Sequence, residues 1–122
     1  MKIKSKPGSR AGKSERYIMP SLLMALKEKP SYGYELLQHM NRFGFVEGQA
    51  PPGMIYRHLR DMEANGWVAS EWKTEEAGPA KRIYQLTPEG DMVLGSWVEY
   101  MKSHAEKLLA FIEMYRGLAE DD

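Results

Sequence analysis

The 122-residue sequence contains no cysteine, only three histidines and no long run of apolar residues. Without cysteine there are no disulfide bonds and no thiolate metal ligands, which suits a reducing compartment. The N-terminus is charged but lacks the apolar core of a signal peptide, and no run approaches the roughly 18 apolar residues of a membrane span. We therefore expect one compact cytoplasmic domain with no membrane contact.

Residue patterns that support catalysis or metal binding are equally scarce. His39, His58 and His104 fall in three separate predicted helices, with no pair at the i,i+4 spacing of a helical metal site. The glycines never assemble into a phosphate-binding loop, and the paired carboxylates 75–76 and 121–122 lie in a loop tip and at the chain end. We expect no enzymatic activity, no metal site and no cofactor.

Charges are unevenly divided along a chain whose formal net charge is zero. Residues 1 to 82 carry 14 Lys and Arg against 9 Asp and Glu, whereas residues 83 to 122 carry 3 against 8. A neutral protein can therefore present a cationic surface. Residues 1–13 are typical of a flexible basic arm, in which Lys13, with Arg16 beyond it, is a candidate DNA contact; a solvated tail fits the same residues equally well.

Apolar residues at helical spacing predict two helices before residue 45. The first begins at Ser14, and Pro20 either starts its regular part or kinks an earlier turn. Ser31 is expected to cap the second helix, whose Leu37 and Met40 then face inward. The residues from 44 to 52 form a loop before the next helix.

A third helix is predicted within "PPGMIYRHLRDMEANGW", residues 51 to 67, where two prolines and a glycine precede the helical period and Asn65-Gly66 stops it. At 100° per residue its inward side holds Ile55, Leu59 and Met62, and the residues that point away are Tyr56, Arg57, Arg60 and Ala64. Arginine can bond bidentately to guanine in the major groove, and both Arg and Tyr can bind phosphate. Taken alone, ordinary surface charges explain the two arginines as well, with Arg57 near Asp61 at the i,i+4 spacing.

The start of this helix lacks the usual capping groups. Pro51 and Pro52 supply no backbone donor and no side-chain cap. The backbone N–H groups of Gly53, Met54 and Ile55 are therefore expected to be free at the positive end of the helix, where a phosphate could accept from them.

After Trp67 the sequence period changes from helical to two. The segments "WVASEWKT" and "RIYQLT" predict a two-stranded hairpin with a turn at Gly78-Pro79. Lys73, Lys81 and Arg82 flank this turn as candidate DNA contacts. We expect Lys81 and Arg82 to touch phosphate and the glutamates at 75 and 76 to be turned away.

A long helix follows, with Thr87 as N-cap and Pro88 in its first turn. Its apolar positions alternate at spacings of four and three over three heptads, which predicts pairing with a second copy; a helix folded back on its own body is the alternative. The predicted dimer interface comprises Leu94, Trp97, Val98, Met101, Ala105, Leu108, Phe111, Ile112 and Tyr115.

Three helices, a hairpin and a long helix are the element order of a winged helix-turn-helix protein with a dimerisation helix. We expect a mainly α fold with a small two-stranded β wing. The predicted units are a basic arm at 1–13, a DNA-binding domain at 14–87, a dimerisation helix at 88–118 and an acidic tail at 119–122. The predicted partners are double-stranded DNA and a second copy of the chain.

Three motifs in this order resemble the PadR-like transcriptional regulators. They are Gly33-Tyr34-Glu35 in the second helix, Tyr56, Leu59, Met62, Glu63 and Gly66 in the third, and Gly78, Pro79, Tyr84, Leu86, Thr87 and Gly90 in the wing. The resemblance covers about residues 17 to 95, and "GPAKRIY" looks most like a subgroup of polyhydroxybutyrate-responsive repressors. Arg57 stands where many members have Pro and Trp67 where Leu is common, so no operator sequence carries over.

The resemblance implies a homodimeric repressor on a palindromic operator, released by a small hydrophobic or phenolic effector bound between the dimerisation helices. Trp97, Tyr100 and Phe111 are then candidates for the effector groove, because a flat ligand can stack on aromatic rings; dimer core is the alternative for these side chains. Two other readings stay open: a winged-helix module that binds protein, and a dimer that binds a small molecule without binding DNA.

Overall fold

Helices and short strands alternate in the computed structural model, which describes residues 16–45, 51–74 and 78–120. The elements are α2 (Ile18–Glu28), β1 (Ser31–Tyr32), α3 (Gly33–His39), the 3-10 helix η1 (Met40–Phe43), α4 (Pro52–Ala64), β2 (Val68–Lys73), β3 (Lys81–Leu86) and α5 (Pro88–Glu120). The predicted arm at 1–13, including Lys13, and the glutamates at 75 and 76 lie outside the described residues. The expected mainly helical winged fold is confirmed.

Helix α2 passes through Pro20 without a kink in its hydrogen bonding. Pro20 is the third residue of the helix, in the first turn, where a backbone N–H has no intrahelical acceptor in any case. The next amide, that of Ser21, donates to the carbonyl of Tyr17 at 3.1 Å. The regular helix therefore begins at Ile18, ahead of the proline.

The prediction that Ser31 caps the second helix is wrong. Ser31 is completely buried in strand β1, which pairs antiparallel with β3, and its Oγ donates to the carbonyl of Lys29 at 3.1 Å. The amide of Tyr32 instead donates to Glu35 Oε1 at 2.8 Å at the start of α3. The wing sheet therefore has three strands, in the order β1-β3-β2, and not the two that the sequence predicts. The sequence does not reveal β1 because a two-residue strand is too short to show a period.

One apolar core lies between the helices and the inner side of this sheet. The inward stripe of α4, Ile55, Leu59 and Met62, is fully buried as expected. From α3 and η1 the buried residues are Leu36 and Met40, whereas Leu37, expected to face inward, is only partly buried. The core is completed by Ile18, Leu22, Leu23, Ala25, Leu26, Val68, Tyr84 and Leu94.

Strands β2 and β3 pair from Val68↔Leu86 to Lys73↔Lys81. Because side chains alternate along a strand, Ser70 and Trp72 share one face with their partners Tyr84 and Arg82, which is the face that reaches the core. Glu71, Lys73, Lys81 and Ile83 share the opposite face. This alternation places Arg82 on one face of the wing and Lys73 and Lys81 on the other.

Helix α5 starts where the sequence predicts. The amide of Gly90 donates to Thr87 Oγ1 at 3.0 Å, and the same hydroxyl donates to the carbonyl of Gly66 at 2.7 Å, so Thr87 caps α5 and fastens it to the end of α4. The helix has 33 residues and is roughly 50 Å long. It continues to Glu120, past the expected end at 118, so the first two residues of the predicted tail are helical.

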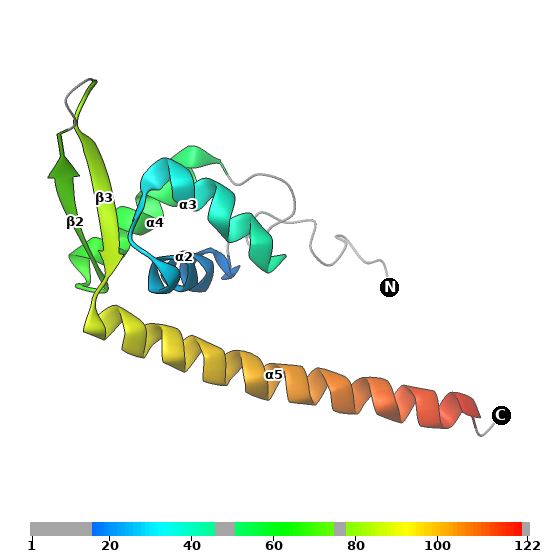
Figure 1. Cartoon of the computed structure of the whole chain (residues 1–122). Coiled ribbons are helices and arrows are strands. Elements are labelled where there is room, and N and C mark those ends of the chain that lie inside the picture. Colours follow the sequence, from blue (N-terminus) through cyan, green and yellow to red (C-terminus); the bar gives the residue numbers. More distant parts are fainter. Residues whose placement is uncertain (1–15, 46–50, 75–77, 121–122) are drawn as a thin grey trace.

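Figure 1 shows α5 running beneath α2 and then projecting well beyond the other labelled helices and strands. Lys27 of α2 and Asp91 of α5 form an ion pair at 2.8 Å where the two helices meet. Within 16–45, 51–74 and 78–120, no helix combines the length and apolar character needed to cross a bilayer.

Candidate nucleic-acid interface

The outward side of α4 is polar and cationic, as its sequence predicts. Tyr56, Arg57, Arg60 and Ala64 are all exposed, whereas the opposite side of the same helix is fully buried. An arginine pair one turn apart on an exposed helix can reach base edges and phosphates at the same time. This side of α4 is therefore the centre of the candidate interface.

The first turn of α4 differs from the prediction. The amides of Met54 and Ile55 both donate to the carbonyl of Pro51, at 3.0 and 3.3 Å, so they are not free to bind phosphate. The Met54 side chain also packs against the core. Gly53 is exposed, and a Cβ atom placed there would meet no heavy atom within 4 Å, so the phosphate contact expected of it stays a prediction.

Arg82, one of the two predicted phosphate contacts of the wing, faces α4. Its Nε donates to Ser70 Oγ at 2.7 Å and its Nη2 lies 3.6 Å from Glu63 Oε2, while Ser70 Oγ donates to the same carboxylate oxygen at 2.8 Å. The guanidinium also lies over the ring of Trp72, 5.4 Å from its centroid. We call Glu63, Ser70 and Arg82 the wing clamp, because together they tie both wing strands to α4.

Lys73, the second wing cation, is paired on its own strand. Its Nζ lies 3.0 Å from Glu71 Oε1, and this hydrogen bond raises the pKa of Lys73. Lys81, the third, extends toward α3, where its Nζ lies 5.4 Å from the ring centroid of Tyr34. The three cations that the sequence places together thus have three different environments.

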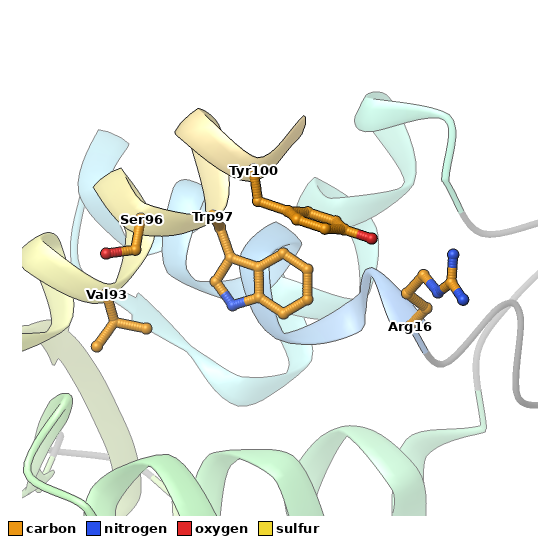
Figure 2. Close-up of a pocket in the computed structure, with 5 residues that line it drawn as sticks. All are labelled: Arg16, Val93, Ser96, Trp97 and Tyr100. Carbon is orange, nitrogen blue, oxygen red and sulfur yellow. The ribbon is translucent and has the colours of Figure 1, made fainter. Parts of the chain in front are cut away.

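Arg16 lies far along the chain from α4 and contributes to a hollow on α5. The hollow has a volume of about 400 Å³ and is lined by Arg16, Val93, Ser96, Trp97 and Tyr100. Figure 2 shows Trp97 and Tyr100 projecting from α5 toward Arg16. Their rings pack edge to face, with centroids 5.9 Å apart.

Of the three residues predicted for the effector groove, the structure brings together Trp97 and Tyr100 but not Phe111. Phe111 lies eleven residues after Tyr100, which is roughly 16 Å farther along the helix axis, and it does not line the hollow. Within one chain, the predicted groove therefore reduces to two aromatic rings with Arg16 beside them.

The predicted dimer seam has two parts in the structure. Leu94 is buried by the protein's own core, and Val98 and Met101 line an apolar hollow of about 200 Å³ together with Met24 and Phe43. Beyond Met101 no part of the described chain covers the helix, and the large apolar side chains that stay exposed are Leu108, Leu109, Phe111, Ile112, Met114, Tyr115 and Leu118. Leu94 also lines this hollow but is only 5% exposed within one chain, so it has little surface left to contribute to the predicted dimer interface.

Three contributors to this surface were not assigned to it from the sequence, although two of them belong to the family motifs. Glu63 and Ser70 become partners of Arg82 only once the wing folds back on α4, and nothing in their spacing indicates that contact. Tyr34 belongs to a recognised motif but gains a place beside Lys81 only through the packing of α3 on β3. Among the described residues, no group of three or more His, Asp or Glu side chains could hold a metal ion.

Comparison with known proteins decides the family. Residues 22–96, more than half of the chain, match the model of the transcriptional regulator PadR-like family. The chain belongs to this family. Its members are transcriptional regulators and not enzymes, so the expectation of no enzymatic activity is confirmed.

Individual relatives agree with this assignment. The probable transcriptional regulator Rv1176c of Mycobacterium tuberculosis (strain ATCC 25618 / H37Rv) is 33% identical over 78 residues, which are 64% of this chain and 41% of that protein. The chain thus spans less than half the length of this relative. The crystal structure of TM0937, a conserved protein of unknown function described as a potential transcriptional factor, has a TM-score of 0.77 at 29% identity and covers 93% of this chain and 98% of that chain.

A third relative shares the fold at lower identity. Bacillus subtilis PadR, solved in complex with operator DNA, has a TM-score of 0.60 at 21% identity and covers 68% of this chain and 47% of that chain. The similarity to the polyhydroxybutyrate-responsive subgroup stays a prediction.

Proposed function

We propose that this PadR-like chain is a cytoplasmic, DNA-binding transcriptional repressor that acts as a homodimer on a palindromic operator. The observation that carries the proposal is the two-sided character of α4. One side is fully buried, and the other exposes Tyr56, Arg57 and Arg60 beside a wing. A helix with one locked side and one cationic side is suited to the major groove. Bacillus subtilis PadR, which shares the fold, was solved in complex with operator DNA, and this supports DNA as the partner.

The homodimer is proposed from the exposed half of α5. A projecting helix with Leu108, Ile112 and Tyr115 on one stripe exposes more contiguous apolar surface than a monomer usually tolerates. The apolar hollow at Val98 and Met101 offers a second copy a further place to pack. Two copies related by a twofold axis would present two α4 helices at a fixed separation, which matches the symmetry of a palindromic site.

Release by a small hydrophobic or phenolic effector is proposed from the hollow on α5. Trp97 and Tyr100 supply aromatic faces there, and Arg16 supplies a cation that could pair with a phenolate or carboxylate. A ligand at this place would contact the helix that sets the separation of the two subunits, so it could favour one spacing over another.

Direct DNA binding tests the proposal. Duplexes that the full-length protein retains from a random-sequence pool are identified, and affinity is measured by fluorescence anisotropy at several salt concentrations. Arg57→Ala combined with Arg60→Ala should weaken binding by about 30-fold or more, since each base or phosphate contact contributes about 1–3 kcal/mol. Lys102→Ala combined with Arg116→Ala removes the same charge from α5 and serves as the matched control.

The outcomes separate the competing functions. Wild-type affinity in the α4 double variant would contradict the assignment of α4 as the reading helix. A wild-type protein that enriches no duplex, and whose binding to DNA does not fall with salt, would favour the protein-binding module. Tight binding of a phenolic ligand by a dimer without any affinity for DNA would favour the ligand-binding dimer.

A further inference from the structure

Lys81 differs from the other two wing cations in its electrostatic surroundings. Lys73 pairs with Glu71 and Arg82 pairs with Glu63, so both charges are largely neutralised by a neighbouring carboxylate. Lys81 has no carboxylate partner among the residues that the structure describes, and its one described contact is the ring of Tyr34. Among the wing residues that the structure describes, the uncompensated charge therefore lies at Lys81, at the start of β3.

Tyr34 is held in place although it is half exposed. Its ring stacks on that of Tyr32, with centroids 5.8 Å apart and planes inclined by 7°. Tyr32 is fixed in turn by β-pairing with Ile83 of the wing. An aromatic ring held in this way can position a lysine ammonium over its face while leaving its hydroxyl in solvent.

Tyr34 and Lys81 are continuous with the outward side of α4. Gly33, which precedes Tyr34, lies directly against Tyr56, because a Cβ atom placed on Gly33 would be 2.8 Å from Tyr56 Oη. Figure 1 shows the first turn of α3 beside β3, where the wing leaves the helical body. A strand of DNA that runs from the first turn of α4 toward the wing would cross Tyr34 and Lys81 on its way.

We propose that Tyr34 and Lys81 together bind one phosphate of the operator backbone, next to the groove that α4 occupies. The inference rests on the proposed function and deepens it. Tyr34 Oη donates a hydrogen bond to a phosphate oxygen, the Lys81 ammonium neutralises the same group, and the Tyr34 ring limits where that ammonium can lie. Arg82 and Lys73, although cationic, are not phosphate contacts in this arrangement.

Salt dependence tests the role of Lys81. With the duplex retained from the random pool, Lys81→Met should lower the slope of log affinity against log salt by about 0.9 and weaken binding to unrelated duplexes to a similar degree. Lys73→Met is the matched control, because Lys73 lies opposite Lys81 in the sheet and carries the same charge. It should leave the slope unchanged.

Two substitutions at position 34 separate its hydroxyl from its ring. Tyr34→Phe should weaken binding by about ten- to hundredfold, as for one hydrogen bond to a charged group, with the salt slope retained. Tyr34→Leu should in addition lower the slope, because Lys81 is no longer positioned. In a double-mutant cycle, Lys81→Met should then cost less in the Tyr34→Leu protein than in the wild type.

Each result has a defined consequence. Equal slopes for Lys81→Met and wild type, in a protein that binds its duplex tightly, would overturn this inference and leave the proposed function intact. Equal losses of slope for Lys73→Met and Lys81→Met would show general charge attraction in place of a built contact. A wild-type protein that binds no duplex would refute the proposed function itself.

Discussion

The ring of Tyr56 fills the space that a side chain at position 33 would need. A Cβ atom placed on Gly33 would lie 2.5 Å from Tyr56 Cε1 and 2.8 Å from its Oη, well inside van der Waals contact. Through this contact the exposed side of α4 rests on the first residue of α3. The two helices of the helix-turn-helix are thereby spaced by a glycine.

Gly33→Ala should change DNA binding more than stability. The atoms that a methyl group would strike belong to the far end of one half-exposed side chain, so Tyr56 can swing into solvent without disturbing the core. We expect a loss of less than about 1 kcal/mol in unfolding free energy, since the strain of overpacking is relieved, together with weaker DNA binding. In a Tyr56→Leu protein the same glycine substitution should have no further effect on affinity.

Gly90→Ala should destabilise the protein much more than Gly33→Ala, because the atom nearest to Gly90 belongs to the backbone. A Cβ atom placed on Gly90 would overlap the carbonyl oxygen of Trp67 and lie 2.8 Å from Leu86 Cδ1. Since neither the α4–β2 connection nor the sheet can yield cheaply, the variant should lose about 1–3 kcal/mol of stability in urea titration.

Gly95→Ala is the matched control for this substitution. It lies in the same helix, and a Cβ atom there would meet nothing within 4 Å. Alanine is favoured over glycine in a helix interior by about 1 kcal/mol, so this variant should be more stable than wild type. A gain in stability at both positions would show that helix propensity, and not the contact with Trp67, decides the outcome.

Elements whose apolar residues recur at a regular spacing could be predicted from the sequence. Features that depend on contacts between distant segments could not. The buried stripe of α4 repeats at helical spacing, so Ile55, Leu59 and Met62 were placed correctly. Strand β1 has two residues and shows no period. Its pairing with β3 is what buries Ser31 and removes it from the predicted cap.

The candidate site divides in the same way. Helical phase alone put Tyr56, Arg57 and Arg60 on the outer side of α4, which the structure bears out. The sequence could not show that Lys81 and Arg82 have different partners. Adjacent strand residues face opposite sides of the sheet, and only the folded wing shows that Glu63 lies on the side of Arg82.

Dimerisation through the projecting half of α5 predicts a sharp effect of charge there. Ile112→Glu would place a carboxylate in the proposed apolar seam, where burying it without a partner costs several kcal/mol. The variant should be monomeric in light scattering at concentrations where the wild type is dimeric. Met92→Glu adds the same charge to an exposed position near the start of α5 and should leave the mass unchanged. A dimeric Ile112→Glu protein would show that the dimer interface lies elsewhere.

The wing clamp predicts that Arg82 acts on the position of the wing and not on the phosphate backbone. Arg82→Met keeps much of the stem that packs on Trp72 but leaves Ser70 and Glu63 without their cation. Because the pair is partly exposed, we expect a loss of only about 1 kcal/mol in unfolding free energy. Hydrogen exchange should quicken at the β2 and β3 amides while the salt slope of DNA binding stays that of wild type. A lower salt slope for Arg82→Met than for wild type would show that Arg82 does contact a phosphate.

The buried Tyr84 should make the unfolding free energy depend on pH in the alkaline range. Burial raises the pKa of Tyr84 above its ordinary value of 10.0, although the nearby Arg82 opposes this shift. Above pH 10 the unfolded chain releases the phenolic proton while the folded protein retains it, so the unfolding free energy falls as pH rises until the folded pKa is passed. Tyr84→Phe keeps the buried ring and removes the proton. In urea titrations from pH 8 to 11, the stability of wild type relative to Tyr84→Phe should therefore decline above about pH 10, because the lysines titrate alike in both proteins and cancel. A constant difference across that range would mean that Tyr84 ionises as easily in the folded protein as in the unfolded chain.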